Sequence, residues 1–199
     1  MGRTSDAKQK ILAAARSLIE ARGYSALGVA EICTAAGVPK GSFYHFFESK
    51  EVLALAVVDE HWAAQQRDWA RALDGDAEPL ERLRRLFEET EAAQHAAQEG
   101  CGTVAGCLFG NLTLELSNQT ESVRERLQEI FEAQVAMVEA VVAEARERGD
   151  IAVADTGAAA RAVVAQLEGQ VLFAKLYNDT GRLSPLWHNC RALLGATAA

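Results

Sequence analysis

Apolar residues recur three or four positions apart along most of this chain, and that spacing limits the fold more than any other feature. Near the N-terminus it is visible in Ile11, Ala15, Leu18 and Ile19, and a longer stripe of the same kind covers residues 127–142. No stretch alternates apolar and polar residues with the period of two that is typical of strands. We therefore expect an all-α fold of about nine helices.

Turn-forming and capping residues divide this pattern into separate helices. Gly23 and Gly149 suit the left-handed conformation that ends a helix, whereas Ser49 and Asp155 suit the position just before one. Proline favours a first turn, so Pro79 indicates another start. We expect a first helix that ends before Gly23. The helices expected after it cover residues 29–36, 40–47, 50–73, a stretch that starts at 79, 105–116, 121–148, 156–177 and 185 to about 195.

The formal charge of the 199-residue chain is −8, which by itself argues against a nucleic-acid partner. The charge is unevenly distributed, however, because residues 1–50 hold seven Lys or Arg against four acidic residues, a balance of +3. The remainder holds 13 basic and 24 acidic residues, a balance of −11. A mildly basic head and an acidic body indicate two parts with different partners; the alternative is a chance asymmetry of a solvated surface.

Composition and short motifs exclude several classes of protein. No apolar run approaches the roughly 20 residues of a membrane-spanning helix, and the N-terminus lacks the apolar core of a secretory signal. The cysteines Cys33, Cys101, Cys107 and Cys190 have no zinc-site spacing, so we expect free thiols in a reducing cytoplasm. Because phosphate-loop and dinucleotide motifs are also absent from the sequence, we expect no cofactor and no metal.

Residues 29–47 have the proportions of a helix-turn-helix, whose second helix enters the major groove of DNA. Its inward positions are apolar: Val29, Ile32, Cys33, Phe43 and Phe47. Its outward positions, with the lysine after Ser49, carry groups that suit phosphates and base edges: Lys40, Gly41, Ser42, Tyr44, His45 and Lys50. The pattern alone also fits a surface turn between two core helices.

Residues 37–51, GVPKGSFYHFFESKE, closely resemble the signature of the tetracycline-repressor (TetR) family of bacterial transcription regulators, and Gly23 with Tyr24 falls at the expected offset upstream. The resemblance implies a DNA-binding domain over residues 1–48 and a helical effector-binding and dimerisation domain over residues 49–199. It implies a dimeric regulator rather than an enzyme. We expect a repressor that binds a palindromic operator in double-stranded DNA and is released by a small molecule.

Two positions depart from the family pattern. Gly28 stands where many members have a threonine that caps the second helix and contacts phosphate. Phe46 stands where a histidine is usual, and His45 lies one place earlier. The first departure removes a phosphate contact, and the second leaves open which side chain reads DNA at this corner.

A second motif surrounds Cys107, in the stretch GTVAGCLFGNL over residues 102–112. The thiol is expected at the start of a helix, where the partial positive charge lowers its pKa and favours the reactive thiolate. The motif resembles the branch of the family that includes the N-ethylmaleimide and acrylate repressors, which implies a cysteine that senses electrophiles or oxidants. Cys101 is a partner for it only if the turn brings the two together, and a structural cysteine that lines an effector pocket is the alternative.

The walls of an effector pocket can be proposed only from residue type and helix face. The candidates are aromatic or polar positions on three expected helices: Trp62, Gln65, Trp69, Phe87, Phe131 and Gln134. Most such residues in an apolar stripe are ordinary core. Gln134 is different because a polar group inside the stripe needs a hydrogen-bond partner from the protein or from a ligand.

The last two expected helices contain more apolar surface than a chain end normally buries alone. We expect them to form a homodimer interface, with packing inside one monomer as the alternative. Two other functions compete with the DNA-binding hypothesis. A thiol-dependent enzyme would need Cys107 close to a base such as His95, and an interaction-only helical dimer would leave the motif at residues 37–51 unexplained.

Overall fold

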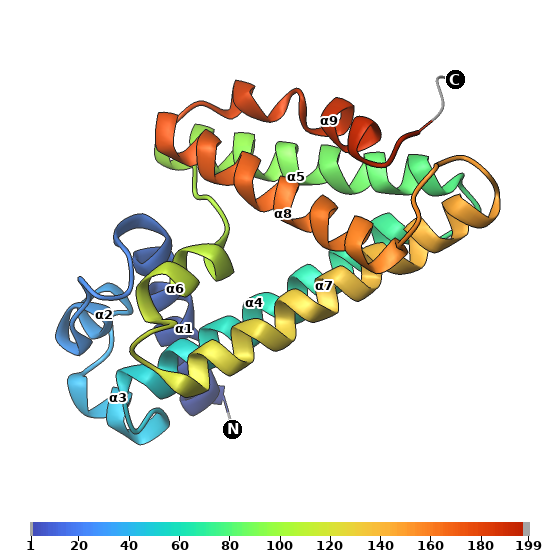
Figure 1. Cartoon of the computed structure of the whole chain (residues 1–199). Coiled ribbons are helices and arrows are strands. Elements are labelled where there is room, and N and C mark those ends of the chain that lie inside the picture. The colour runs from blue at the N-terminus through green and yellow to red at the C-terminus, as the bar shows by residue number, and fades with distance from the viewer. Residues whose placement is uncertain (1, 197–199) are drawn as a thin grey trace. The chain divides into compact units, whose positions relative to one another are not determined.

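The computed structural model describes residues 2–196, with side chains from Asp6 onward (Figure 1). This described part contains nine α-helices, one 3-10 helix and no strand, so the expected all-α class is confirmed. The elements are α1 (Gly2–Arg22), α2 (Val29–Ala35), α3 (Lys40–Phe46), α4 (Lys50–Leu73), α5 (Pro79–Cys101), α6 (Leu108–Leu116), α7 (Glu121–Glu147), α8 (Thr156–Tyr177), η1 (Thr180–Leu183) and α9 (Leu186–Leu193).

The helices form two compact units. The head unit contains the residues up to 63 together with 108–129, and the body unit contains residues 64–107 and those from 130 onward. The chain therefore passes from one unit to the other within α4, between Cys107 and Leu108, and within α7. The expected DNA-binding helices α1, α2 and α3 all belong to the head unit.

The core of the head unit is built from the apolar faces of its helices. Ile11 of α1, Ile32 of α2, Phe43 of α3 and Phe109 of α6 are all almost completely buried. The turn between α2 and α3 is closed by Gly37 at φ +64°, a left-handed conformation that glycine adopts without steric cost. These contacts orient the outer face of α3 away from the core.

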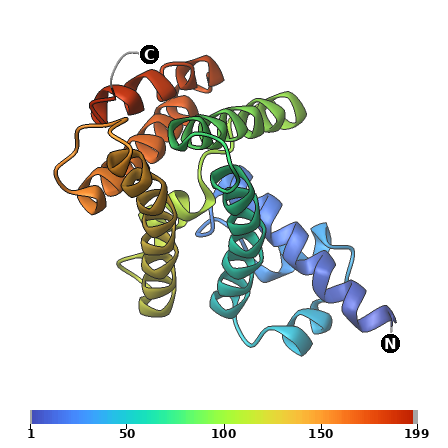
Figure 2. The same ribbon diagram turned by 90° about the vertical axis from the view of Figure 1, so that its right-hand side faces the viewer.

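The body unit contains the second part of α4, α5, the second part of α7, α8 and α9. Its core is a continuous set of aliphatic residues that includes Leu83, Val142, Ala160 and Leu186. Helix α9 packs on α8 and α5 (Figure 2). Within the described residues, we find no helix with the length and apolar character needed to cross a membrane.

Several expected helix starts are confirmed. The Ser49 hydroxyl accepts a hydrogen bond from the Val52 N–H at 3.1 Å, and the Asp155 carboxylate accepts one from the Ala158 N–H at 2.9 Å. Pro79 is the first residue of α5. The expected start of α6 at residue 105 is wrong, because Gly106 has φ +78° and the helix begins only at Leu108.

Candidate nucleic-acid interface and regulatory cysteine

The outer face of α3 presents most of the predicted DNA-contacting residues to solvent. Lys40, Gly41, Tyr44 and His45 are exposed, whereas Ser42 is half-buried. The Tyr44 side chain is 56% exposed and stands edge-on to the buried ring of Phe43, with ring centroids 5.2 Å apart. The arrangement offers an ammonium, a phenol and an imidazole on one short helix that is fixed from behind.

The inward positions of the helix-turn-helix are buried as predicted. Ile32 and Cys33 of α2 and Phe43 and Phe47 around α3 are at most 3% exposed, while Val29 is half-buried. Phe46 is also half-buried, and its ring lies edge-on to His45 at 4.7 Å between centroids. His45 is therefore the more exposed of the two side chains at this corner.

Helix α2 starts without a side-chain cap. Gly28 occupies the capping position in an extended conformation, φ −102° and ψ 149°, and provides only its backbone carbonyl to the first turn. No atom lies within 4 Å of the position that a Cβ on Gly28 would take. The structure thus has room for a threonine at position 28, and glycine there removes the hydroxyl that would cap α2.

Lys50 was predicted to face phosphate, and in the structure its ammonium also binds the segment before α2. Its Nζ donates to the carbonyl oxygens of Tyr24 at 3.2 Å and Leu27 at 3.0 Å, and it lies 4.1 Å from the centroid of the Tyr24 ring. Lys50 is half-buried at the start of α4. An ammonium has three N–H donors, and two of them are used on the segment that leads into α2.

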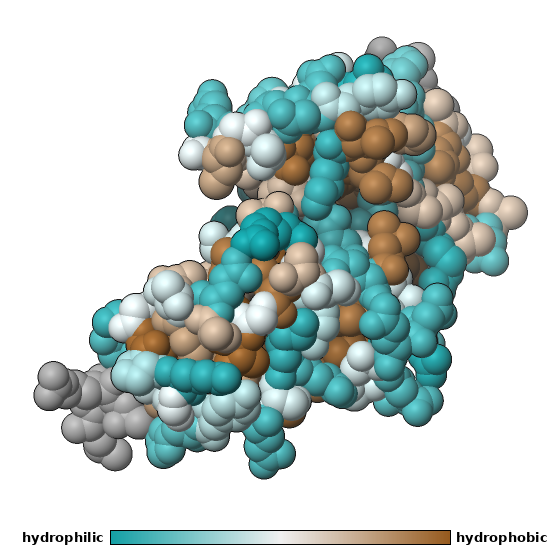
Figure 3. Space-filling model, turned by 90° about the vertical axis from the view of Figure 1, so that its left-hand side faces the viewer, coloured by the Kyte–Doolittle hydropathy of each residue, from teal (hydrophilic) through white to brown (hydrophobic). Residues whose placement is uncertain are grey.

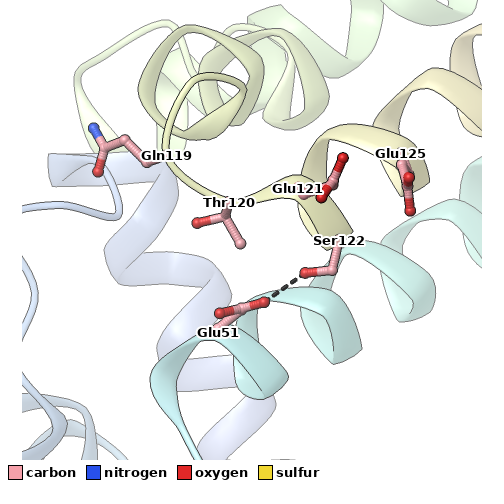
Figure 4. Close-up of a pocket in the computed structure, with 6 residues that line it drawn as sticks. All are labelled: Glu51, Gln119, Thr120, Glu121, Ser122 and Glu125. Carbon is pink, nitrogen blue, oxygen red and sulfur yellow. Dashed lines mark hydrogen bonds between the residues drawn. The ribbon is translucent and has the colours of Figure 1, made fainter.

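An acidic pocket of about 450 Å³ lies in the head unit where α4 and α7 begin (Figure 4). Its lining includes the carboxylates of Glu51, Glu121 and Glu125, and the hydroxyl of Ser122 donates to Glu51. Glu51 and Glu121 lie in first helical turns, where a negative charge is stabilised by the helix dipole. The pocket is electrostatically unsuited to a phosphate backbone, which favours α3 as the surface that contacts DNA.

Residues 102–107, which we name the α6 turn, are held by side chains from α5 and from the end of α8. The Gln94 side chain accepts from the Gly106 N–H at 3.0 Å and donates to the Gly106 carbonyl at 3.1 Å. Asn178 accepts from the Val104 N–H at 2.8 Å, and Lys175 donates to the Ala105 carbonyl at 3.0 Å. The backbone that leads to Cys107 is therefore fixed from two sides.

Cys107 is half-buried directly before α6, and its thiol is hydrogen-bonded to the carboxyl group of Glu168 on α8. Burial raises the pKa of Glu168, and the hydrogen bond from Cys107 acts in the opposite direction. Sequence reasoning missed Glu168, although the signal was available. Glu168 interrupts the apolar stripe of Val164 and Leu167, which is the criterion that selected Gln134.

The remaining cysteines differ sharply from one another. Burial raises the pKa of Cys33 and raises that of Cys190 to about 12, so both thiols stay protonated and serve as packing groups. Cys101 is exposed at the end of α5. All four cysteines are free thiols in this structure.

His95 was named as the base that a thiol-dependent enzyme would need beside Cys107. In the structure its Nδ1 is hydrogen-bonded to the Thr180 hydroxyl at 2.7 Å, so its nearest bonded partner is a threonine.

The predicted pocket residues lie in both units. Trp62 belongs to the head unit, where it packs edge-on against Phe109, whereas the other candidates, Gln65, Trp69, Phe87, Phe131 and Gln134, belong to the body unit. Trp69 and Phe87 are buried in the core of the body unit, and Phe131 is partly buried against it. Gln134 is only 1% exposed, and its Nε2 donates to Gln65 Oε1 at 3.0 Å. Its own Oε1 is buried without a hydrogen-bond partner in the protein.

The last part of α8 and one residue of α9 expose apolar side chains: Leu172, Phe173, Leu176, Tyr177 and Leu193. We name this set the α8 face, and Figure 3 shows apolar side chains on the surface of the body unit. The other apolar residues of these helices on which the dimer prediction depended are mostly internal. Val163, Val164, Leu167, Val171, Leu186 and Leu194 are buried within the monomer.

Comparison with known proteins gives matches over nearly all of the chain. The family model of bacterial regulatory proteins, tetR family, matches residues 11–57, and that of the tetracyclin repressor-like C-terminal domain matches residues 79–188. The chain is 30% identical to the HTH-type transcriptional repressor NemR of Escherichia coli (strain K12) over 145 residues, 71% of this chain and 70% of NemR. It is 36% identical to the transcriptional regulator AcuR of Cereibacter sphaeroides over 176 residues, 85% of this chain and 77% of AcuR.

Solved structures give the same result. A regulatory protein TetR from Rhodobacter sphaeroides superposes with a TM-score of 0.85 at 31% identity, covering 94% of this chain and 98% of that one. The reduced form of Escherichia coli NemR superposes with a TM-score of 0.84 at 26% identity, covering 98% of this chain and 100% of NemR.

Proposed function

Because this chain belongs to the TetR family of bacterial regulatory proteins, we propose that it is a dimeric repressor of transcription that binds a palindromic operator. The observation that carries this proposal is the outer face of α3, where Lys40, Tyr44 and His45 are exposed over a buried Phe43. The name of NemR as a transcriptional repressor supports the same direction of control. Release follows from a small effector or from chemical modification of Cys107.

In this proposal α3 lies in the major groove. Lys40 contacts a phosphate, and Gly41 has no side chain to hold the backbone away from the DNA. Ser42, Tyr44 and His45 donate hydrogen bonds to base edges or to phosphates that flank the groove. The third N–H of Lys50 reaches a phosphate at the start of α4. The acidic remainder of the chain, residues 51–199, is repelled by the duplex, so the basic residues 1–50 face it.

Two copies of the α8 face form the dimer contact in this proposal. Its residues, among them Phe173 at 52% and Leu176 at 69% exposure, are large and apolar, and such a patch is characteristic of an association surface. Phe173→Arg is expected to convert the dimer to a monomer in sedimentation velocity. The control Leu114→Arg changes an apolar residue of the head unit that is 77% exposed and should leave the dimer intact. Dimers of both variants would contradict this interface.

The body unit provides two groups for release. The first is Cys107, which is placed by the α6 turn and bonded to Glu168. The second is the buried Gln134 carbonyl, for which an effector with an N–H or O–H donor would supply the missing partner. The structure of Escherichia coli NemR is described as a reduced form, and this supports redox chemistry in the present chain.

The DNA-binding part is tested by selection from random duplexes followed by fluorescence anisotropy at physiological salt. We expect a palindromic site whose half-sites are about 34 Å apart, one helical turn, or a multiple of that distance. Lys40→Ala should weaken binding about tenfold, whereas Arg67→Ala removes one exposed positive charge from the body unit and should leave it unchanged. Absence of any palindromic preference would contradict the repressor proposal.

The release part is tested with N-ethylmaleimide. Mild treatment of the wild type should modify Cys107, as identified by mass spectrometry, and lower its affinity for the operator. Cys107→Ser should bind the operator normally and resist release. Cys101→Ser should respond like the wild type, because Cys101 is exposed at the end of α5 and an adduct on it would extend into solvent. If Cys107→Ser is released as readily as the wild type, a reversible effector acts in place of the thiol.

A thiol-dependent enzyme is the alternative function. It would consume an electrophile repeatedly and release a product, whereas a sensor thiol reacts once for each protomer. p-Nitrophenyl acetate separates the two. A catalytic Cys107 would form an acetyl thioester that water hydrolyses, so each protomer would release more than one equivalent of p-nitrophenolate, whereas a sensor thiol would release at most one.

A further inference from the structure

The segment that leads into α2 precedes a helix without a side-chain cap. We name residues 23–28 the α2 turn. Gly28 supplies no side-chain oxygen, so the first turn of α2 lacks the interaction that normally fixes a helix start. Whatever determines where α2 begins must therefore act on the turn from other parts of the chain.

Glu115 of α6 binds the α2 turn through two consecutive backbone amides. Its Oε1 accepts from the Tyr24 N–H at 3.1 Å and its Oε2 accepts from the Ser25 N–H at 2.8 Å. Gly23 has φ +79°, and a Cβ on it would lie 2.7 Å from Glu115 Oε1. The carboxylate thus occupies the space that only a glycine leaves open.

Lys50 of α4 binds the carbonyl groups of the same turn. Its ammonium donates to Tyr24 and Leu27, so the turn gives its N–H groups to an anion and its C=O groups to a cation. Hydrogen bonds to charged groups are stronger than bonds between neutral groups. The two side chains together hold the segment from which α2 begins.

Helix α6 is itself firmly packed within the head unit. Phe109 and Leu112 are completely buried, and the Phe109 ring lies edge-on to His61 and Trp62 of α4 at centroid distances of 5.1 and 6.2 Å. The helix starts at the residue after Cys107. One rigid segment of nine residues therefore joins the cysteine to the carboxylate that holds the α2 turn.

We propose that Glu115 is the positioning residue of the DNA-binding head, because it fixes the start of α2 and transmits any displacement of α6 to it. The proposal rests on the proposed function, since it concerns how a head that binds DNA is placed. It adds a residue that acts through the backbone of Tyr24 and Ser25 and that makes no contact with DNA or effector itself.

Hydrogen exchange tests the structural half without any DNA. In Glu115→Ala, the amides of Tyr24 and Ser25 and those of α2 should exchange about tenfold faster than in the wild type. Glu115→Gln keeps one acceptor oxygen and should fall between the two. The control Glu125→Ala removes an exposed carboxylate from the same unit and should change nothing. Wild-type exchange of α2 in Glu115→Ala would overturn the proposal.

Transmission is tested by loosening α6 at a distance from Glu115. Phe109→Leu removes part of its buried contact with α4 and should accelerate exchange in the α2 turn, with circular dichroism used to verify that the variant is folded. The control Leu114→Ala changes an exposed residue on the same helix and should leave the turn protected. Unchanged exchange in Phe109→Leu would show that α6 does not transmit displacement to α2.

Operator affinity tests the functional half. Glu115→Ala should bind the selected operator about fivefold more weakly, with the wild-type dependence on salt, because no phosphate contact is lost. Binding equal to that of Glu125→Ala would overturn the positioning role. If the wild type itself binds no operator, the proposed function has failed, and the exchange measurements still decide whether Glu115 fixes α2.

Discussion

The α2 turn and the α6 turn are both fixed in front of a helix by side chains, but the side chains differ in charge. Each is a short segment with a left-handed glycine before a helix, and each is held by side chains distant in sequence. The α2 turn is held by the charged groups of Glu115 and Lys50. The α6 turn is held mainly by the neutral amides of Gln94 and Asn178, with one bond from Lys175 to the Ala105 carbonyl.

The difference indicates what each turn does. A turn held by single charged groups depends on whether those two groups stay in place, so it can be released by moving one helix. A turn held by several neutral hydrogen bonds loses little when one of them is lost, and it is suited to present a reactive side chain in a constant position. Helix α6 joins the two turns, because it begins after the second and carries Glu115 to the first.

The largest expected difference between the turns concerns their glycines. Gly23→Ala would place a Cβ against the Glu115 carboxylate and also strain a left-handed backbone, and we expect it to lower the free energy of unfolding by about 3 kcal/mol. Gly102 also has a left-handed backbone, at φ +76°, but a Cβ there would meet no atom within 4 Å. Gly102→Ala should therefore lower the free energy of unfolding by only about 1 kcal/mol. Urea unfolding measures both, and equal losses would show that the contact with Glu115 carries no cost.

A smaller effect is expected from the neutral side of the comparison. Gln94→Ala removes both hydrogen bonds to Gly106 and should lower the free energy of unfolding by about 2 kcal/mol. Gln166→Ala is the control, because its side chain makes one long bond of 3.5 Å and is also half-buried. A Gln94→Ala variant as stable as this control would mean that the α6 turn is held by the α8 end alone.

Lys50→Met tests the charged groups that hold the α2 turn, because it keeps most of the length of the side chain and removes the ammonium. Operator affinity should fall about tenfold, and the dependence of its logarithm on salt should become less steep by about one unit, because a phosphate contact is lost. Anisotropy titrations at several salt concentrations measure both. Weaker binding with an unchanged slope would assign Lys50 to the α2 turn alone.

The smallest expected effect is a gain. Gly28→Thr gives α2 a cap of its own in a space that is open, and it should raise the free energy of unfolding by a few tenths of a kcal/mol. In this background Glu115→Ala should accelerate hydrogen exchange in α2 less than it does in the wild type. Equal acceleration in both backgrounds would separate the cap of α2 from the role of the carboxylate.

Local signals in the sequence were sufficient for most of the fold. The glycine at 23, the caps at Ser49 and Asp155 and the proline at 79 each act on the residues next to them, and all four helix ends were predicted. The start of α6 was expected at residue 105 but lies at Leu108, because the apolar pattern runs across Gly106, whose left-handed backbone cannot belong to the helix.

The side chains that hold the turns were beyond this kind of inference. Glu115 and Tyr24 are 91 positions apart, and Asn178 and Val104 are 74 apart, so no spacing rule links them. Lys50 was singled out as a charge near the start of α4, and its predicted contact with phosphate stays a prediction. Its bonds to the α2 turn join residues 26 and 23 positions apart, which no spacing rule links. The predicted contacts of α3 with DNA and of Cys107 with electrophiles remain predictions of the family resemblance and of the proposals above.

The 91-residue separation between Tyr24 and Glu115 also has a consequence for synthesis of the chain. Translation adds about 5–20 residues per second, so Tyr24 leaves the ribosome roughly 5–20 s before the carboxylate that holds the α2 turn. During that interval a nascent head lacks one of the two groups that fix its second helix. In the proposal that Glu115 positions α2, the chain becomes competent to recognise DNA only after residue 115 has been made.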